Sequence, residues 1–160
     1  MKKFIIILFI IFTLLFQGCN MSDPKYIHFD SKPNNSYYTH LIDSKIINNE
    51  DYSIELFNTN MHKRIKIDDS EKVIIKNFID SLSNDNYKEY EEIDETEIYQ
   101  IRITFNYEKY IIKIYDKNKI SVNPWDGTYE KDIIYMDNIP IRYNLYNFCV
   151  HVENRDIYRR

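Results

Sequence analysis

The chain has 160 residues, of which 44% are hydrophobic, 29% charged and 16% aromatic, and its formal net charge is −4. This length suits one domain with a single core and excludes two domains with separate sizeable cores. There is no alanine, and the two glycines are Gly18 and Gly127. A chain so poor in glycine excludes the glycine-rich phosphate loops of nucleotide-binding proteins and the GxSxG nucleophile elbow.

The N-terminus has the pattern of a secretory signal. Lys2 and Lys3 precede an apolar run of 13 residues, Phe4 to Phe16. Such a run lies within the roughly 7–15 residues of a signal-peptide core and below the roughly 17–25 that span a bilayer as a helix. The next residues, Leu15-Phe16-Gln17-Gly18-Cys19, resemble the lipobox of bacterial lipoproteins. The alternative is an uncleaved signal anchor, and with either one the remaining chain lies outside the cytoplasmic membrane.

The lipobox resemblance implies that Cys19 carries a diacylglyceryl group and becomes the first residue of the mature protein. Each buried methylene contributes about 0.8 kcal/mol, so two acyl chains anchor a protein firmly where one does so marginally. We therefore expect a lipid-anchored protein on the extracytoplasmic face of the cell membrane. Without Lys2 and Lys3, 19 basic side chains face 25 acidic ones, a net charge near −6 that disfavours nucleic acid as a partner.

The expected domain organisation has three parts. Residues 1–18 form the lipoprotein signal peptide, and residues 19–36 form a polar tether that contains Pro24 and Pro33. Residues 37–160 form a single folded domain. Its one cysteine, Cys149, cannot make an intrachain disulfide and is expected to be a small buried apolar residue.

The first half of the domain predicts two strands and a helix. The strands cover residues 53–58 and 62–67, and in the second one isoleucines alternate with basic residues. Asp68 and Glu71 then form a capping-box-like pair at the start of a helix. One apolar stripe follows at helical spacing: Ile75, Phe78, Ile79 and Leu82.

The second half predicts an antiparallel meander and a last helix. Three runs, residues 99–105, 110–115 and 120–122, are separated by short polar connections of hairpin length. The turn Pro124-Trp125-Asp126-Gly127 leads to a fourth run at residues 129–136, and Gly127 is where we expect the mature backbone to use glycine's freedom. Pro140 suits the first turn of a helix over residues 139–152. The order of elements predicts an α+β fold, an antiparallel β-meander sheet packed by one or two helices.

Several segments carry a family resemblance, namely the lipobox, Asn123-Pro124-Trp125-Asp126-Gly127, Asn144-Leu145-Tyr146 and Phe148-Cys149. With them the chain resembles a family of small clostridial lipoproteins of about this length, classed as a domain of unknown function. The resemblance extends through most of the mature chain. It implies surface localisation and a single domain, and it transfers no catalytic residue because the family has no assigned activity.

Candidate catalytic and metal sites are weak in this sequence. Six carboxylates crowd the segment 89–97, but a calcium loop needs oxygen ligands arranged by a sharp turn, usually with a glycine, so we interpret the segment as a solvated loop. The four histidines, residues 28, 40, 62 and 151, show no metal-ligand spacing. We predict no catalytic residue, no metal and no cofactor. The rival hypothesis is a small envelope hydrolase that pairs Asp126 with a distant carboxylate.

The aromatic excess of the C-terminal third is the candidate contact surface. Aromatic rings stack on sugars and pack on partner proteins, although most tyrosines in strands belong to the core. We therefore expect a non-enzymatic module that binds an envelope protein or a wall glycan. A third hypothesis is a structural or inhibitory module that pairs through an exposed sheet edge. The candidate contact residues are Trp125, Tyr129, Tyr135, Tyr143 and Tyr146.

Overall fold

The computed structural model describes residues 32–127 and 129–158. The expected signal peptide, Cys19 and most of the expected tether lie outside these residues. Within them the chain forms one antiparallel seven-stranded sheet and three α-helices. This confirms the α+β class, with one helix more than the two expected at most.

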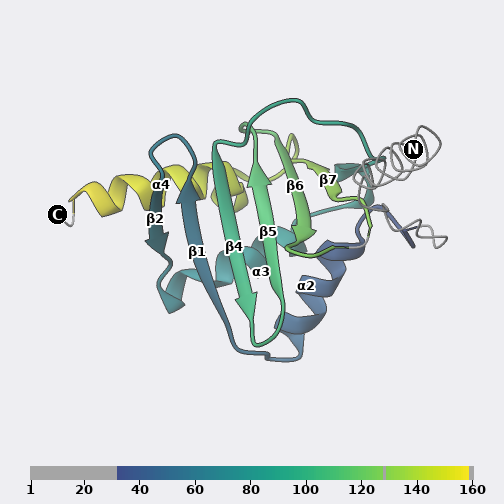
Figure 1. The fold of residues 1–160 in the computed structure, drawn as a ribbon, viewed down its shortest axis with the longest axis horizontal. Coiled ribbons are helices and arrows are strands. Elements are labelled where there is room, and N and C mark those ends of the chain that lie inside the picture. Colours follow the sequence, from purple (N-terminus) through teal and green to yellow (C-terminus); the bar gives the residue numbers. More distant parts are fainter. Residues whose placement is uncertain (1–31, 128, 159–160) are drawn as a thin grey trace, which may run out of the picture. The chain divides into compact units, whose positions relative to one another are not determined.

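The elements follow one another as a helix, a hairpin, a second helix, an edge strand, the meander and a last helix (Figure 1). The strands lie in the order β2-β1-β4-β5-β6-β7-β3, which confirms both the hairpin and the meander. Their bounds are α2 Tyr37–Ile47, β1 Tyr52–Asn58, β2 Lys63–Lys66, α3 Val73–Asp80, β3 Tyr87–Lys88, β4 Tyr99–Phe105, β5 Lys109–Ile114, β6 Lys119–Pro124, β7 Asp132–Tyr135 and α4 Leu145–Tyr158.

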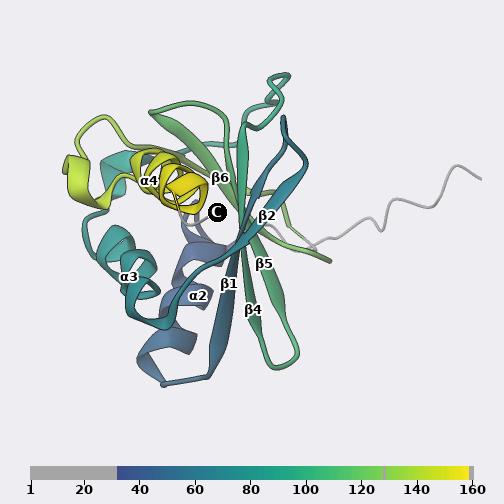
Figure 2. The ribbon, with the colours of Figure 1, turned by 90° about the vertical axis from the view of Figure 1, so that its left-hand side faces the viewer.

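The three helices lie on one side of the sheet, and the core fills the space between (Figure 2). Strand β4 shows why, because its residues alternate between fully apolar and polar positions. Ile101 and Ile103 are completely buried under the helices, whereas Arg102 and Thr104 are half-buried on the opposite face. This period of two is what a sheet with one covered face requires.

A buried carboxylate joins α2 to the sheet. Asp132, completely buried on β7, accepts hydrogen bonds of 2.8 Å from the backbone N–H and the hydroxyl of Thr39 in the first turn of α2. Lys32 lies 2.7 Å from the other carboxylate oxygen and pairs the charge. Asp132 therefore stabilises the N-terminus of α2 from a distant strand, a role that a local capping residue usually fills.

The start of the second helix differs from the expected capping box. Asp69–Glu71 form a short 3-10 helix before α3, and the side chain of Asp68 makes no capping hydrogen bond. Glu71 forms an ion pair with Arg155 of α4 instead. The pattern in the sequence is thus used for a contact between helices rather than within one.

The last helix starts later than expected. Pro140 precedes a 3-10 turn at Ile141–Tyr143, and α4 begins only at Leu145. Asn144 explains the position, because its side-chain oxygen accepts a hydrogen bond of 3.1 Å from the N–H of Asn147. An asparagine in this place is a strong helix start.

Gly127 does not use the positive φ expected of it. The described positive-φ residues are Asn49 and His62. Gly127 is needed for a close approach, because a Cβ there would lie 2.7 Å from the ring of Pro124 and 3.0 Å from the Tyr38 hydroxyl. The absence of a side chain at this position lets the turn after β6 pack against α2.

Candidate functional site

We call the side of the sheet opposite α2, α3 and α4 the open face. The strand register assigns one carboxylate to it, Glu55, and seven cationic side chains. These cations are Arg64, Lys66, Lys88, Arg102, Lys109, Lys113 and Lys119. A protein of negative net charge thus concentrates positive charge on one face, and such a face attracts anions.

Arg102 lies near the middle of this face and is held rigidly. Its Nε and Nη2 donate to the side-chain oxygen of Gln100 at 3.1 and 2.8 Å, and Nη1 donates to Glu55 at 3.4 Å. The guanidinium also stacks 4.5 Å from the ring centre of Phe57. Arg64 lies on the other side of Glu55, 3.9 Å from the same carboxylate oxygen. These contacts orient a planar donor group without burying it.

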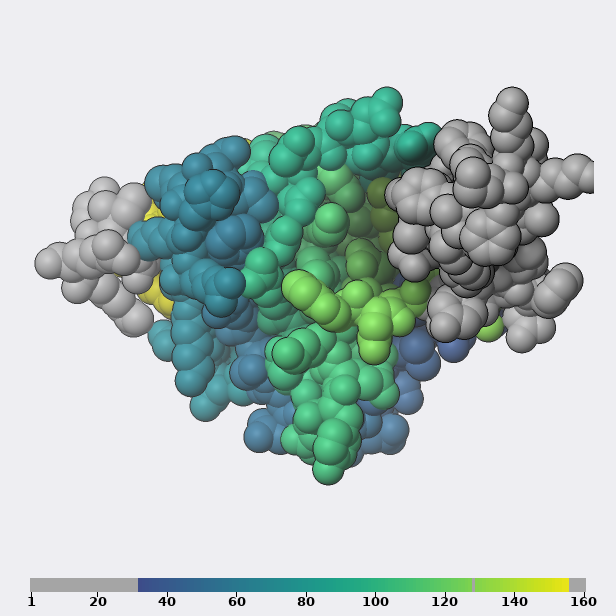
Figure 3. Space-filling model, viewed as in Figure 1, coloured from purple at the N-terminus to yellow at the C-terminus, as the bar shows by residue number. Residues whose placement is uncertain are grey.

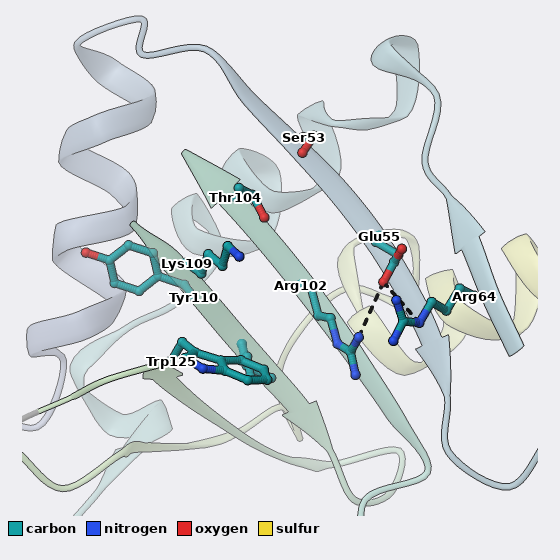
Figure 4. Close-up of a pocket in the computed structure, with 9 residues that line it drawn as sticks. Ser53, Glu55, Arg64, Arg102, Thr104, Lys109, Tyr110 and Trp125 are labelled. Atoms are coloured by element: carbon teal, nitrogen blue, oxygen red, sulfur yellow. Dashed lines mark hydrogen bonds and ion pairs between the residues drawn. The ribbon is translucent and has the colours of Figure 1, made fainter. Parts of the chain in front are cut away.

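A hollow of about 300 Å³ lies on the open face beside Arg102. Figure 4 shows the Trp125 ring and Lys109 at its β5 end, with Arg102, Glu55 and Arg64 across it towards β1 and β2. The remaining lining residues are Ser53, Thr104, Tyr110 and Ile111. The hollow therefore combines an aromatic ring, cations and hydroxyl groups.

Trp125 is presented to solvent by the strand that precedes it. Its backbone N–H donates a hydrogen bond of 2.8 Å to the carbonyl of Lys109, so the turn after β6 stays fixed to β5. The side chain is 67% exposed. In Figure 3 the lime-green segment to which Trp125 belongs projects from the middle of the open face. A ring this exposed does not belong to the core, and a large exposed aromatic residue on an ordered turn is typical of a contact residue.

A second hollow, of about 420 Å³, lies on the other side of Trp125. Its lining includes Lys113 and Lys131, the carboxylate of Glu130, and the aromatic residues Tyr90 and Tyr129. Trp125 lines both hollows and stands between them, so one partner that covers its ring can reach into each. We call the two hollows together the Trp125 groove.

The acidic segment 89–97 is bound to the open face by ion pairs. Glu97 lies 3.4 Å from Lys113, and Glu91 and Glu95 lie 3.6 and 3.8 Å from Lys119. Burial raises the pKa of Glu97, but hydrogen bonds from its own backbone and Gln100 and the charge of Lys113 outweigh this effect and lower it. The expected solvated loop is thus also held to the sheet by ion pairs, which the sequence did not indicate.

The five candidate contact residues do not share one surface. Trp125 and Tyr135 belong to the open face, where the Tyr135 hydroxyl donates to Glu91. Tyr129 lines the second hollow together with Trp125 and packs edge-on against Tyr37 of α2. Tyr146 of α4 packs against Tyr99 under the sheet. Tyr143, in the 3-10 turn before α4, packs against the core and under the guanidinium of Arg142.

The residues that the sequence analysis left out of the site are Arg102, Arg64 and Lys109. The alternation of residues 99–105 already assigned Arg102 to the polar face of a strand. What the sequence did not provide is the neighbour of that face, because the pairing of β4 with β1 joins residues 47 positions apart.

Asp126, the carboxylate of the hydrolase hypothesis, lines a third hollow together with Glu108. A hydrogen bond from Tyr110 and the charge of Lys45 lower the pKa of Glu108 below its ordinary value. A general acid for glycoside hydrolysis needs a raised pKa, so Glu108 does not have the property of that acid.

Sheet edges, histidines and the thiol give little support to other functions. The edge strands have four residues (β2) and two (β3), and β2 has the sequence Lys-Arg-Ile-Lys, which disfavours pairing with another chain. Among the described residues no three histidine, cysteine, aspartate or glutamate side chains group as metal ligands. Cys149 is completely buried, and burial raises its pKa well above the usual value, so the thiol is unreactive.

None of the helices in the described part of the chain is long and apolar enough to cross a membrane.

A known protein family matches most of the described chain. Residues 32–149 match the model of the family described as "Domain of unknown function (DUF4883)". The chain belongs to the DUF4883 family. The matched residues run from the lysine that pairs with Asp132 to the buried cysteine of α4, so the DUF4883 domain includes the sheet, α2 and α3.

One solved structure shares the DUF4883 fold seen here. It is the crystal structure of a protein described as "Putative Lipoprotein from Clostridium perfringens", 30% identical in sequence, with a TM-score of 0.71. The match covers 78% of this chain and 99% of the other. No match was found among curated proteins. The family confirms the expected resemblance to clostridial lipoproteins of unknown function.

Proposed function

We propose that this DUF4883 protein is a lipid-anchored, extracytoplasmic binding module that contacts an envelope partner through the Trp125 groove. Residues 1–18 would be the signal peptide, Cys19 the lipid attachment site and residues 19–36 the tether of a single domain, 37–160. The lipobox-like segment supports the anchor, and so does the likeness to a protein described as a lipoprotein. The partner is a protein or a wall glycan, and the module performs no catalysis.

One observation carries the binding function. An ordered, 67% exposed tryptophan stands over a face to which the strands contribute seven cations and one carboxylate. A buried tryptophan would have contributed to stability, and an exposed one on a hollowed surface is available to a partner.

The anchor is tested by fractionating cells that produce the full chain or Cys19→Ser. We expect the parent protein in the membrane fraction, and we expect protease added to cells stripped of their wall to digest it. Cys19→Ser should be found in the medium or the soluble fraction. Membrane retention of a Cys19→Ser chain from which residues 1–18 have been removed would contradict lipid anchoring.

The groove is tested by the retention of Trp125→Ala on isolated cell envelopes. To separate binding from anchoring, the Cys19→Ser chain serves as the parent and is mixed with envelopes. Tyr107→Ala is the matched control, since Tyr107 is fully exposed in the β4–β5 connection and lines neither half of the groove. We expect loss of retention for Trp125→Ala alone, and equal retention of both variants would exclude the groove as the contact site.

A further inference from the structure

We propose that the Trp125 groove binds a segment of an acidic polysaccharide, with a sugar ring stacked on the indole and an anionic substituent held by Arg102 and Lys109. This rests on the proposed function and specifies its ligand. The ligand class is a chain of sugars that carries carboxylate or phosphate groups.

The cations of the groove have capacity for an anion. Gln100 accepts two of the five N–H groups of the Arg102 guanidinium and Glu55 accepts a third, which leaves two without a partner among the described residues. Lys109 is exposed and makes no ion pair with any described residue. Arg64, Arg102 and Lys109 give the first half of the groove three positive charges against the single negative charge of Glu55. An oxyanion therefore gains charge-assisted hydrogen bonds there.

The neutral groups of the groove suit a sugar. A pyranose ring has an apolar C–H face and a rim of hydroxyl groups, and Trp125 offers a flat apolar face of matching character. The hydroxyls of Ser53 and Thr104 lie in the same hollow and have no hydrogen-bond partner among the described residues. Glu55 supplies carboxylate oxygens that can accept from sugar hydroxyls.

The extent of the groove points to a chain of sugars rather than a single unit. Hollows of about 300 and 420 Å³ lie on either side of the same tryptophan. The second is lined by Lys131, by Glu130 and by Lys113, which pairs with Glu97, so the unpaired positive charge lies in the first. A polymer that crosses Trp125 contacts both hollows and places an anionic group beside Arg102 and Lys109.

A flat anionic bilayer fits this surface less well. It touches only the most prominent groups, and it leaves the Ser53 and Thr104 hydroxyls and the Arg102 donors that line the first hollow without partners. The hollowed, polar lining therefore favours an inserted polar chain over a lipid surface.

The proposal is tested by calorimetry with the full chain in nanodiscs of neutral lipid. The probes are polygalacturonate for carboxylates, phosphomannan for phosphates, dextran as a neutral polysaccharide, polyglutamate as a polyanion without sugar rings, single-stranded DNA, and vesicles with anionic lipid. We expect binding to one or both acidic polysaccharides. The affinity should fall as salt rises from about 0.02 to about 0.15 M, because salt screens the attraction between the cationic side chains and the anionic groups. Binding to dextran and polyglutamate should be at least about tenfold weaker, because each lacks one of the two recognised features.

Three variants divide the binding between stacking and charge. Trp125→Ala should weaken binding at least about fivefold through loss of stacking. Arg102→Gln should weaken it about tenfold through loss of charge-assisted hydrogen bonds, and Lys109→Ala about threefold. Weaker binding of Lys109→Ala cannot be attributed to misfolding, since the Lys109 amine makes no hydrogen bond or ion pair with a described residue. Tyr107→Ala and Lys117→Ala, both exposed and outside the groove, should bind like the parent.

The results separate this inference from the proposed function. If polyglutamate binds as tightly as the acidic polysaccharides, or if DNA or anionic vesicles bind more tightly, the assignment of a polysaccharide ligand is overturned. Absence of binding to both acidic polysaccharides, with Trp125-dependent envelope retention intact, would overturn the ligand and leave the binding module standing. Loss of both would overturn the groove itself.

Discussion

At the scale of single residues, the Trp125 turn is fixed by a backbone hydrogen bond to Lys109 and by the close approach of Gly127 to Pro124. The sequence predicted a turn at Pro124–Gly127 and made Trp125 a candidate contact residue. It could not predict the role of Asp132, because the helix N–H group that this carboxylate binds lies 93 residues away. Local sequence patterns predict turns and exposed side chains, but the hydrogen-bond partner of a residue such as Asp132 depends on which distant segments the fold brings together.

Gly127→Ala tests the close approach. The new Cβ would collide with the rigid Pro124 ring, so we expect a loss of about 1–3 kcal/mol in the free energy of unfolding and a shifted Trp125 fluorescence maximum. Chemical denaturation monitored by circular dichroism and fluorescence gives both quantities. A substitution elsewhere in the turn, Asp126→Ala, is the control, and unchanged stability of Gly127→Ala would contradict the steric argument.

Tyr87 gives the fold a defined weakness at alkaline pH. Burial, with further effects of the nearby charges of Asp132 and Asp43, raises the pKa of Tyr87 to about 12. The unfolded chain releases this proton near pH 10 and the folded one does not, so stability is complete below pH 10 and decreases between pH 10 and 12.

The Tyr87→Phe variant isolates that contribution. Between pH 10 and 12 it should lose about 1 kcal/mol less of its unfolding free energy than the parent, measured by urea denaturation at each pH. Tyr107→Phe should follow the parent. Parallel curves for Tyr87→Phe and the parent would contradict the assignment.

At the scale of elements, strands were more predictable than helices. The alternation in β1 and β4 follows directly from one covered face, whereas in β5 the residue of the open face, Ile111, is buried as well. In all three the predicted runs nearly coincide with the observed strands. The sequence analysis did not predict helix α2, although Tyr38, Leu41, Ile42 and Ile46 have helical spacing. The helix directly follows a polar stretch that has the composition of a tether. The capping-box-like pair failed because Glu71 finds Arg155 of α4, a partner far along the chain.

The acidic segment 89–97 makes an element-scale prediction about pH. The lowered pKa of Glu97 means that its ion pair and hydrogen bonds stabilise the fold above the unfolded value of 4.5. That contribution is lost as the pH falls through the folded pKa. We expect Glu97→Gln to reduce the unfolding free energy at pH 7 by about 0.5–1 kcal/mol and to flatten its dependence below pH 5. Glu92→Gln, exposed in the same segment, serves as the control, and an identical acid profile for Glu97→Gln and the parent would contradict this role.

For the whole molecule, the distribution of charge matters more than its sum. A net charge of −4 disfavours polyanions as partners, yet the fold sorts its cations onto one face and leaves the carboxylates elsewhere or in ion pairs. Composition therefore could not reveal that one face of the sheet gathers these cations. That face appears only when β1, β4, β5 and β6 are placed side by side.

The most direct test of the Trp125 groove uses the protein's single tryptophan as its own reporter. Fluorescence quenching of the full chain in neutral nanodiscs is compared for iodide, caesium and acrylamide, with and without polygalacturonate or phosphomannan. An exposed indole among cations should be quenched more strongly by iodide than by caesium, and an acidic polysaccharide should protect it from all three. Equal quenching by iodide and caesium, with no protection by either polysaccharide, would contradict the account.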